Sequence, residues 1–69
     1  MTTPTKKEIA DAFRQQAGAM VEFESVLDTL KPTDASHIRK AYALARYAGE
    51  SVLASIEIAK KQIKPEYRR

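Results

Sequence analysis

The side chains suited to acid–base or metal chemistry are few, and their spacing does not form a catalytic set. The single histidine, His37, has no sequence neighbour that would make it a general base or a metal ligand. Glu24 and Asp28 lie one helical turn apart, but two carboxylates alone do not make a metal site. We therefore expect these acids to form an ion pair with Arg39 on a neighbouring helix.

The motifs of common enzyme classes are also missing from the sequence. It contains no glycine-rich phosphate loop, no Ser/His/Asp set and no HExxH pattern. It has no cysteine, which excludes a thiolate zinc site and a disulfide framework. A chain of two helices would also enclose no substrate pocket of its own. We expect a protein that is not an enzyme and that needs no cofactor or metal.

Basic side chains gather near the C-terminus of this chain, whose formal net charge is +3. The cations of the last ten residues are Lys60, Lys61, Lys64, Arg68 and Arg69, against Glu66 alone. In an antiparallel hairpin this end lies beside Lys6 and Lys7. Such a basic end suits nucleic-acid phosphates or an acidic protein surface. It equally suits a solubilising helix end, because cations interact favourably with the helix dipole there.

The first element that positions these groups is an amphipathic helix over about residues 6–30. Thr5 and Glu8 form a capping box, which predicts a helix start at Lys6. Apolar residues then recur at alternating steps of four and three, with Gln16 as the one polar member, and the other face is polar. The members of this seam are Ile9, Phe13, Gln16, Met20, Phe23, Leu27 and Leu30.

A second helix is predicted over about residues 34–63, after Pro32 stops the first and Thr33 or Asp34 caps the next. Its seam continues the same spacing through Ile38, Tyr42, Ala45, Gly49, Val52, Ile56, Ala59 and Ile63. Residues 65–69 should form a flexible tail. The short connection makes the helices antiparallel neighbours. The predicted fold is all-α, a two-helix hairpin forming a single domain over residues 1–69.

Folding the hairpin about residues 32 and 33 aligns the two seams in a definite register. The predicted pairs are Phe23 with Tyr42, Phe13 with Val52, Ile9 with Ile56, and Gln16 with Gly49. In the last pair a long side chain faces a position without one, which is consistent with interlocking packing.

The second helix is apolar around more of its circumference than one partner helix can cover. Its further stripe comprises Leu44, Tyr47, Ala48, Ser51, Ser55 and Ile58. Burying this stripe against a second hairpin would give a dimeric four-helix bundle. We therefore predict that these residues form a face for a homodimer or for another protein.

The function predicted from these features is that of a small non-catalytic helical interaction protein, such as an adaptor, inhibitor or regulator. The alternative is a nucleic-acid-binding hairpin dimer that uses the basic end. No apolar run approaches the roughly 20 residues of a membrane span, and the N-terminus lacks the apolar core of a signal peptide. We expect a cytoplasmic protein with no membrane partner.

Overall fold

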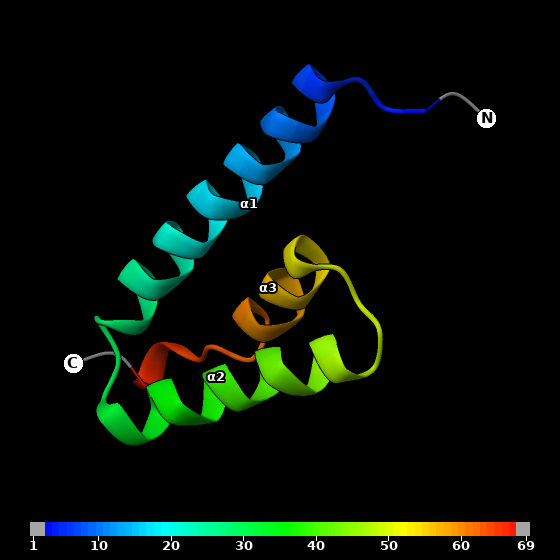
Figure 1. Cartoon of the computed structure of the whole chain (residues 1–69). Coiled ribbons are helices and arrows are strands. Elements are labelled where there is room, and N and C mark those ends of the chain that lie inside the picture. Colours follow the sequence, from blue (N-terminus) through cyan, green and yellow to red (C-terminus); the bar gives the residue numbers. More distant parts are fainter. Residues whose placement is uncertain (1–2, 68–69) are drawn as a thin grey trace.

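The chain folds into helices only, over residues 3–67, which are the residues that the computed structural model describes. The helices are α1 (Lys6–Leu27), α2 (Pro32–Tyr47) and α3 (Val52–Lys60), followed by a 3-10 turn, η1 (Pro65–Tyr67) (Figure 1). The all-α prediction is confirmed. The single helix expected over residues 34–63 is wrong, because the chain reverses between α2 and α3.

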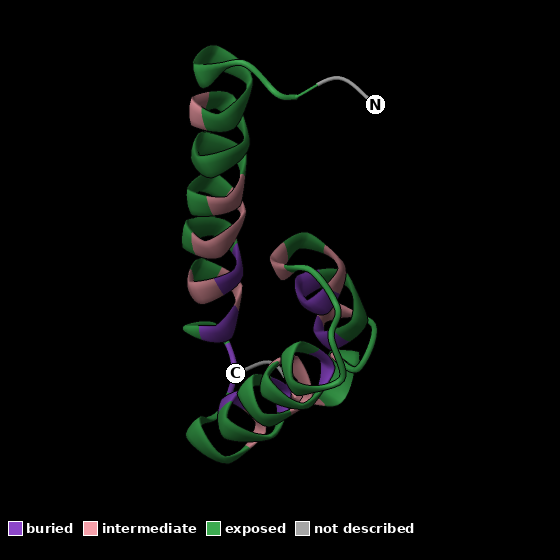
Figure 2. Ribbon diagram, turned by 45° about the vertical axis from the view of Figure 1, so that its right-hand side comes forward, coloured by how far each residue is buried: buried purple, intermediate pink, exposed green. Residues whose placement is uncertain are grey.

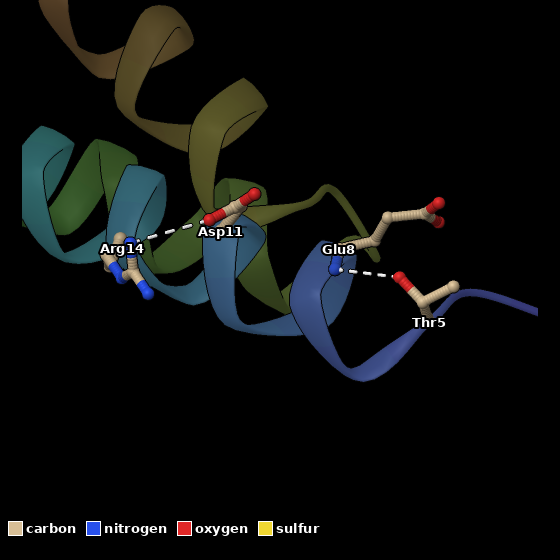
Figure 3. A network of polar contacts seen from close by, with 4 residues as sticks. All are labelled: Thr5, Glu8, Asp11 and Arg14. Atoms are coloured by element: carbon tan, nitrogen blue, oxygen red, sulfur yellow. Dashed lines mark hydrogen bonds and ion pairs between the residues drawn. The ribbon is translucent and has the colours of Figure 1, made fainter.

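Helix α1 begins where its sequence predicts. Thr5 has an extended backbone, and its hydroxyl accepts a hydrogen bond of 3.2 Å from the Glu8 amide (Figure 3). This bond satisfies one of the amides that a helix start leaves without a partner. The helix start at Lys6 is therefore set by a contact within four residues.

The connection between α1 and α2 differs in detail from the prediction. Helix α1 ends at Leu27 instead of about residue 30, and the Thr29 hydroxyl donates to the Val26 carbonyl at 2.6 Å. Pro32 opens α2 as its first residue, where the missing amide hydrogen costs nothing. The cap is Lys31, in the extended conformation typical of a residue before proline, and not Thr33 or Asp34.

The break between α2 and α3 is made by Gly49, which has a φ of +99°. Its amide donates to the Arg46 carbonyl at 3.0 Å, and the Glu50 amide donates to the Ala45 carbonyl at 3.1 Å. These two bonds form a Schellman ending, in which glycine adopts the left-handed conformation. Gly49 does not face Gln16 as expected, because a Cβ added at Gly49 would have no neighbour within 4 Å.

Helix α3 begins at Val52, three residues after Gly49. The Ser51 hydroxyl accepts from the Ala54 amide at 3.1 Å and caps the new helix. Across the turn, Arg46 Nη1 donates to the Glu50 carbonyl at 2.7 Å. Helix α3 thereby folds back along α2 and also reaches α1.

The core lies where the three helices meet, at the C-terminal half of α1 (Figure 2). Its buried members are Phe23, Leu27, Leu30, Ala35, Ile38, Ile56 and Ala59. The rings of Phe23 and Tyr42 lie 5.7 Å apart between centroids, which confirms the predicted contact of this pair. An aromatic pair at this distance and tilt contributes stability beyond its buried area.

The C-terminal turn η1 is attached to this core. The Lys31 amide donates to the Tyr67 carbonyl at 3.4 Å, and the Tyr67 side chain packs against the core. The Lys64 ammonium lies 6.0 Å from the centre of the Tyr67 ring. The flexible tail predicted over 65–69 is therefore wrong for residues 65–67, while Arg68 and Arg69 lie outside the described residues.

Gly49 and Gly18 offer a matched test of the break. We expect Gly49→Ala to lower the free energy of unfolding by about 1–2 kcal/mol, because a side chain strains the left-handed backbone. Gly18 lies inside α1 with open space around it, so Gly18→Ala should stabilise by up to about 1 kcal/mol. Thermal unfolding followed by circular dichroism measures both changes. A higher melting temperature for Gly49→Ala would contradict the left-handed turn.

Candidate functional site

The first half of α1, residues 6–18, extends beyond the rest of the molecule, and we call it the α1 arm. Helix α3 has nine residues and a length of about 14 Å, whereas α1 has 22 residues and a length of about 33 Å. The buried residues of α1, Phe23 and Leu27, both lie in its second half. Figures 1 and 2 show the arm standing clear of α3, with mostly exposed residues.

An apolar surface runs along one side of the α1 arm. Ile9 is 45% exposed and Phe13 is 66% exposed. They line a shallow surface hollow together with Pro4, Glu8, Ala12 and Gln16, and we call this set the arm surface. The pairing of Ile9 with Ile56 and of Phe13 with Val52 is wrong, because the fold-back at Gly49 turns α3 away from the arm.

The arm surface has the pattern of a helix that docks into a protein groove. Ile9, Phe13 and Gln16 lie at the spacing of four and three residues that places side chains on one face. The opposite face carries Asp11 and Arg14, whose side chains form an exposed ion pair of 3.5 Å (Figure 3). A helix with one apolar face and one charged face is the form recognised in helix-in-groove binding. The arm therefore presents one apolar face and one charged face.

A second hollow lies on the other half of α1, and we call it the acidic groove. Met20, Val21, Glu24, Ser25 and Asp28 line it. The Glu24 carboxylate accepts a hydrogen bond of 2.8 Å from Arg39 Nη2, so the predicted ion pair between the helices is confirmed. This hydrogen bond and the charges of Glu24 and Asp28 raise the pKa of Arg39 above its usual value.

The titratable side chains of the described residues do not gather into a cluster with metal-ligand geometry. Within residues 3–67, no group of three or more His, Cys, Asp or Glu side chains is placed to hold a metal ion. His37 is exposed on α2, and Glu24 is engaged by Arg39.

The stripe predicted for a dimer face is divided by the break at Gly49. Leu44 and the 92% exposed Tyr47 lie on α2, and Ile58 is exposed on α3. Ala48 ends α2 and Ser51 caps α3. Ser55 has no exposed surface, because it packs into the contact of α3 with the core, so its place on an outer face is wrong.

The basic residues expected at one end of the hairpin lie on separate parts of the fold. Lys60 Nζ is 3.9 Å from the Glu22 carboxylate, which lies about 24 Å along α1 from Lys6. Lys64 lies over Tyr67, beside the connection of α1 to α2. Lys6 and Lys7 are on the arm, while Lys61 is exposed at the end of α3. The expected cluster of Lys6 and Lys7 with Lys60, Lys61 and Lys64 is therefore wrong, and Arg68 and Arg69 lie outside the described residues.

The arm surface is the feature that the sequence prediction missed, since Ile9 and Phe13 were expected to be buried. The sequence contains a signal for the break between α2 and α3: Gly49, which favours a helix end, is followed by Ser51, which favours a helix start. Among the described residues, no helix has the length and apolar character needed to cross a bilayer. No family model, curated protein or solved structure matches the chain.

Two phenylalanines of α1 test the distinction between core and arm surface. We expect Phe23→Ala to lower the free energy of unfolding by about 3–5 kcal/mol, because the side chain is 1% exposed and its removal leaves a cavity. Phe13→Ala should change it by no more than about 0.5 kcal/mol, because the ring already faces solvent. Urea unfolding at low protein concentration provides the comparison. Equal losses in both variants would contradict the exposed position of Phe13.

Proposed function

We propose that the protein is a small, non-catalytic helical interaction protein, an adaptor, inhibitor or regulator that binds another protein through the α1 arm. The observation that carries this proposal is the exposure of Ile9 and Phe13 on a helix half that α3 does not reach. Large apolar side chains that gather on one exposed face are typical of interaction sites. The partner would cover the arm surface as a groove covers an amphipathic helix.

Charge placement favours a protein partner over nucleic acid. Phosphate binding gains affinity when several cations act together along one surface. Here Lys60 lies near Glu22, Lys64 lies over Tyr67, and Lys6 lies on the distant arm. The basic residues of the described surface are therefore spread over several sites. Nucleic-acid binding stays the alternative function, and the experiment below includes it as an outcome.

Self-association belongs to the same proposal. A bundle built from two long hairpins needs a continuous second helix, and the three-helix chain offers the arm as the helix available for pairing. The homodimer proposed here would use the exposed apolar surface on α1. Self-association and the binding of another protein are both protein–protein interactions through helix faces.

Capture experiments with surface variants test the proposed function. The immobilised protein would be incubated with a lysate of its native host, with and without nuclease, and bound proteins would be identified by mass spectrometry. We expect Phe13→Glu to abolish capture, because a carboxylate cannot be buried in an apolar contact without a large desolvation cost. Capture should be insensitive to nuclease.

Tyr47→Glu is the matched control, because it places the same charge on a more exposed aromatic position of another helix. Retention of captured protein by Tyr47→Glu and its loss from Phe13→Glu would locate binding on the arm. Capture that disappears after nuclease treatment would favour the nucleic-acid alternative. Loss with Tyr47→Glu alone would instead assign binding to α2.

A further inference from the structure

Helix α1 carries two exposed apolar surfaces with opposite electrostatic surroundings. The arm surface begins beside Lys6 and Lys7, the first two residues of the helix. The acidic groove has an apolar floor of Met20 and Val21, and Glu24 and Asp28 form its acidic rim. Val21 is itself among the exposed large apolar side chains. One helix therefore presents both a basic apolar end and an acidic apolar groove.

We propose that the partner of the α1 arm is a second copy of this chain, paired antiparallel along α1, so that each arm lies in the acidic groove of the other copy. The proposal rests on the proposed function, because it uses the same arm surface. It adds the identity of the partner and the position at which the arm docks. An antiparallel pair related by a two-fold axis forms both arm–groove contacts at once.

The residue positions on α1 fit this arrangement. At about 100° per residue, Lys6 and Glu24 lie on the same flank of the helix. In an antiparallel pair, positions on the same flank of the two helices face each other. With the two-fold axis near residue 15, Lys6 lies opposite Glu24 of the second copy, and Phe13 and Met20 lie within about 40° of them on the same side of the helix. The cation then meets the acidic rim while the apolar side chains meet the apolar floor.

The charge distribution on α1 supports this orientation. The first turn carries Lys6 and Lys7 against Glu8, whereas the last two turns carry Glu22 and Glu24, and the C-cap is Asp28. A parallel pair would bring like charges together at both ends, which is unfavourable. The antiparallel pair is therefore the self-complementary one.

The surface area of the monomer also favours a second copy. The chain exposes 5382 Å². A compact monomer of 7.7 kDa exposes about 4,300 Å², so this chain exposes roughly 1,100 Å² more. A standard protein–protein interface removes about 800 Å² from each partner. Burial of the arm and the groove in a dimer would bring the exposed area close to that of a compact protein.

The test combines molecular mass with cross-linking, which is specific here because the natural chain has no cysteine. Sedimentation equilibrium of the natural protein should give twice the 7.7 kDa chain mass. A Lys6→Cys/Glu24→Cys double variant treated with a short bismaleimide should form a covalent dimer. The two positions are about 27 Å apart within one α1, so a short reagent cannot join them in the same chain.

The single variants Lys6→Cys and Glu24→Cys are the matched controls. Neither should cross-link, because an antiparallel pair holds equivalent positions far apart. Phe13→Glu should give the monomer mass while keeping the helical circular dichroism of the natural protein, which separates loss of pairing from loss of folding. A doubled mass, a double-variant cross-link and a monomeric Phe13→Glu would together support the proposal.

Three outcomes would overturn the antiparallel pair. They are a natural protein that stays monomeric at millimolar concentration, efficient cross-linking of either single variant, and a Phe13→Glu variant that still dimerises. The capture experiment separates this failure from failure of the proposed function. A monomeric protein that binds another protein through Phe13 would keep the proposed function and exclude the second copy. A monomer with no Phe13-dependent binding would remove both.

Discussion

The left-handed backbone at Gly49 is the constraint on which the rest of this fold depends. The bonds from the Gly49 and Glu50 amides to the Arg46 and Ala45 carbonyls end α2 within one turn. The Ser51 cap then starts α3 almost immediately. All of these contacts are local in sequence, so the turn can form as soon as its neighbouring helices do. Helix α3 is thereby directed back along α2 and away from the arm.

The reversal creates a mismatch of length between α1 and the helices that cover it. Helix α1 is more than twice as long as α3, so the core forms only at its C-terminal half. The remaining half keeps its amphipathic pattern without an intramolecular partner. This mismatch in length leaves the arm surface exposed, and an exposed apolar helix face is suited to protein binding.

Phe13 and Phe23 show how one seam acquires two roles. Both belong to the same stripe of α1, and both are large aromatic side chains. Phe23 contacts Tyr42 and lies within the core, whereas Phe13 is 66% exposed. The difference arises because α3 covers the second half of α1 and not the first; it does not arise from any property of α1. Apolar residues at helical spacing therefore predict a face that becomes buried. They do not indicate whether that face is buried within the same chain or against another chain.

Several features follow from the sequence alone because they depend on contacts within a helix or on simple complementarity. The Thr5 cap, the helical class, the Phe23–Tyr42 contact and the Glu24–Arg39 ion pair were all predicted correctly. Each requires only helix periodicity and a close approach of α1 and α2 near their connection. These requirements hold for a two-helix hairpin and for the three-helix fold alike.

Only the tertiary structure decided the path of the chain after Tyr47. The seam from Ile38 to Ile63 keeps its spacing across the break, and its members Ile56 and Ala59 are buried on α3. Glycine suits both a close helix contact and a left-handed helix ending, so Gly49 by itself did not distinguish them. The reversal buried Ser55, tied Tyr67 to Lys31 and left Ile9 and Phe13 exposed. These outcomes depend on where distant segments meet, which a one-dimensional pattern does not encode.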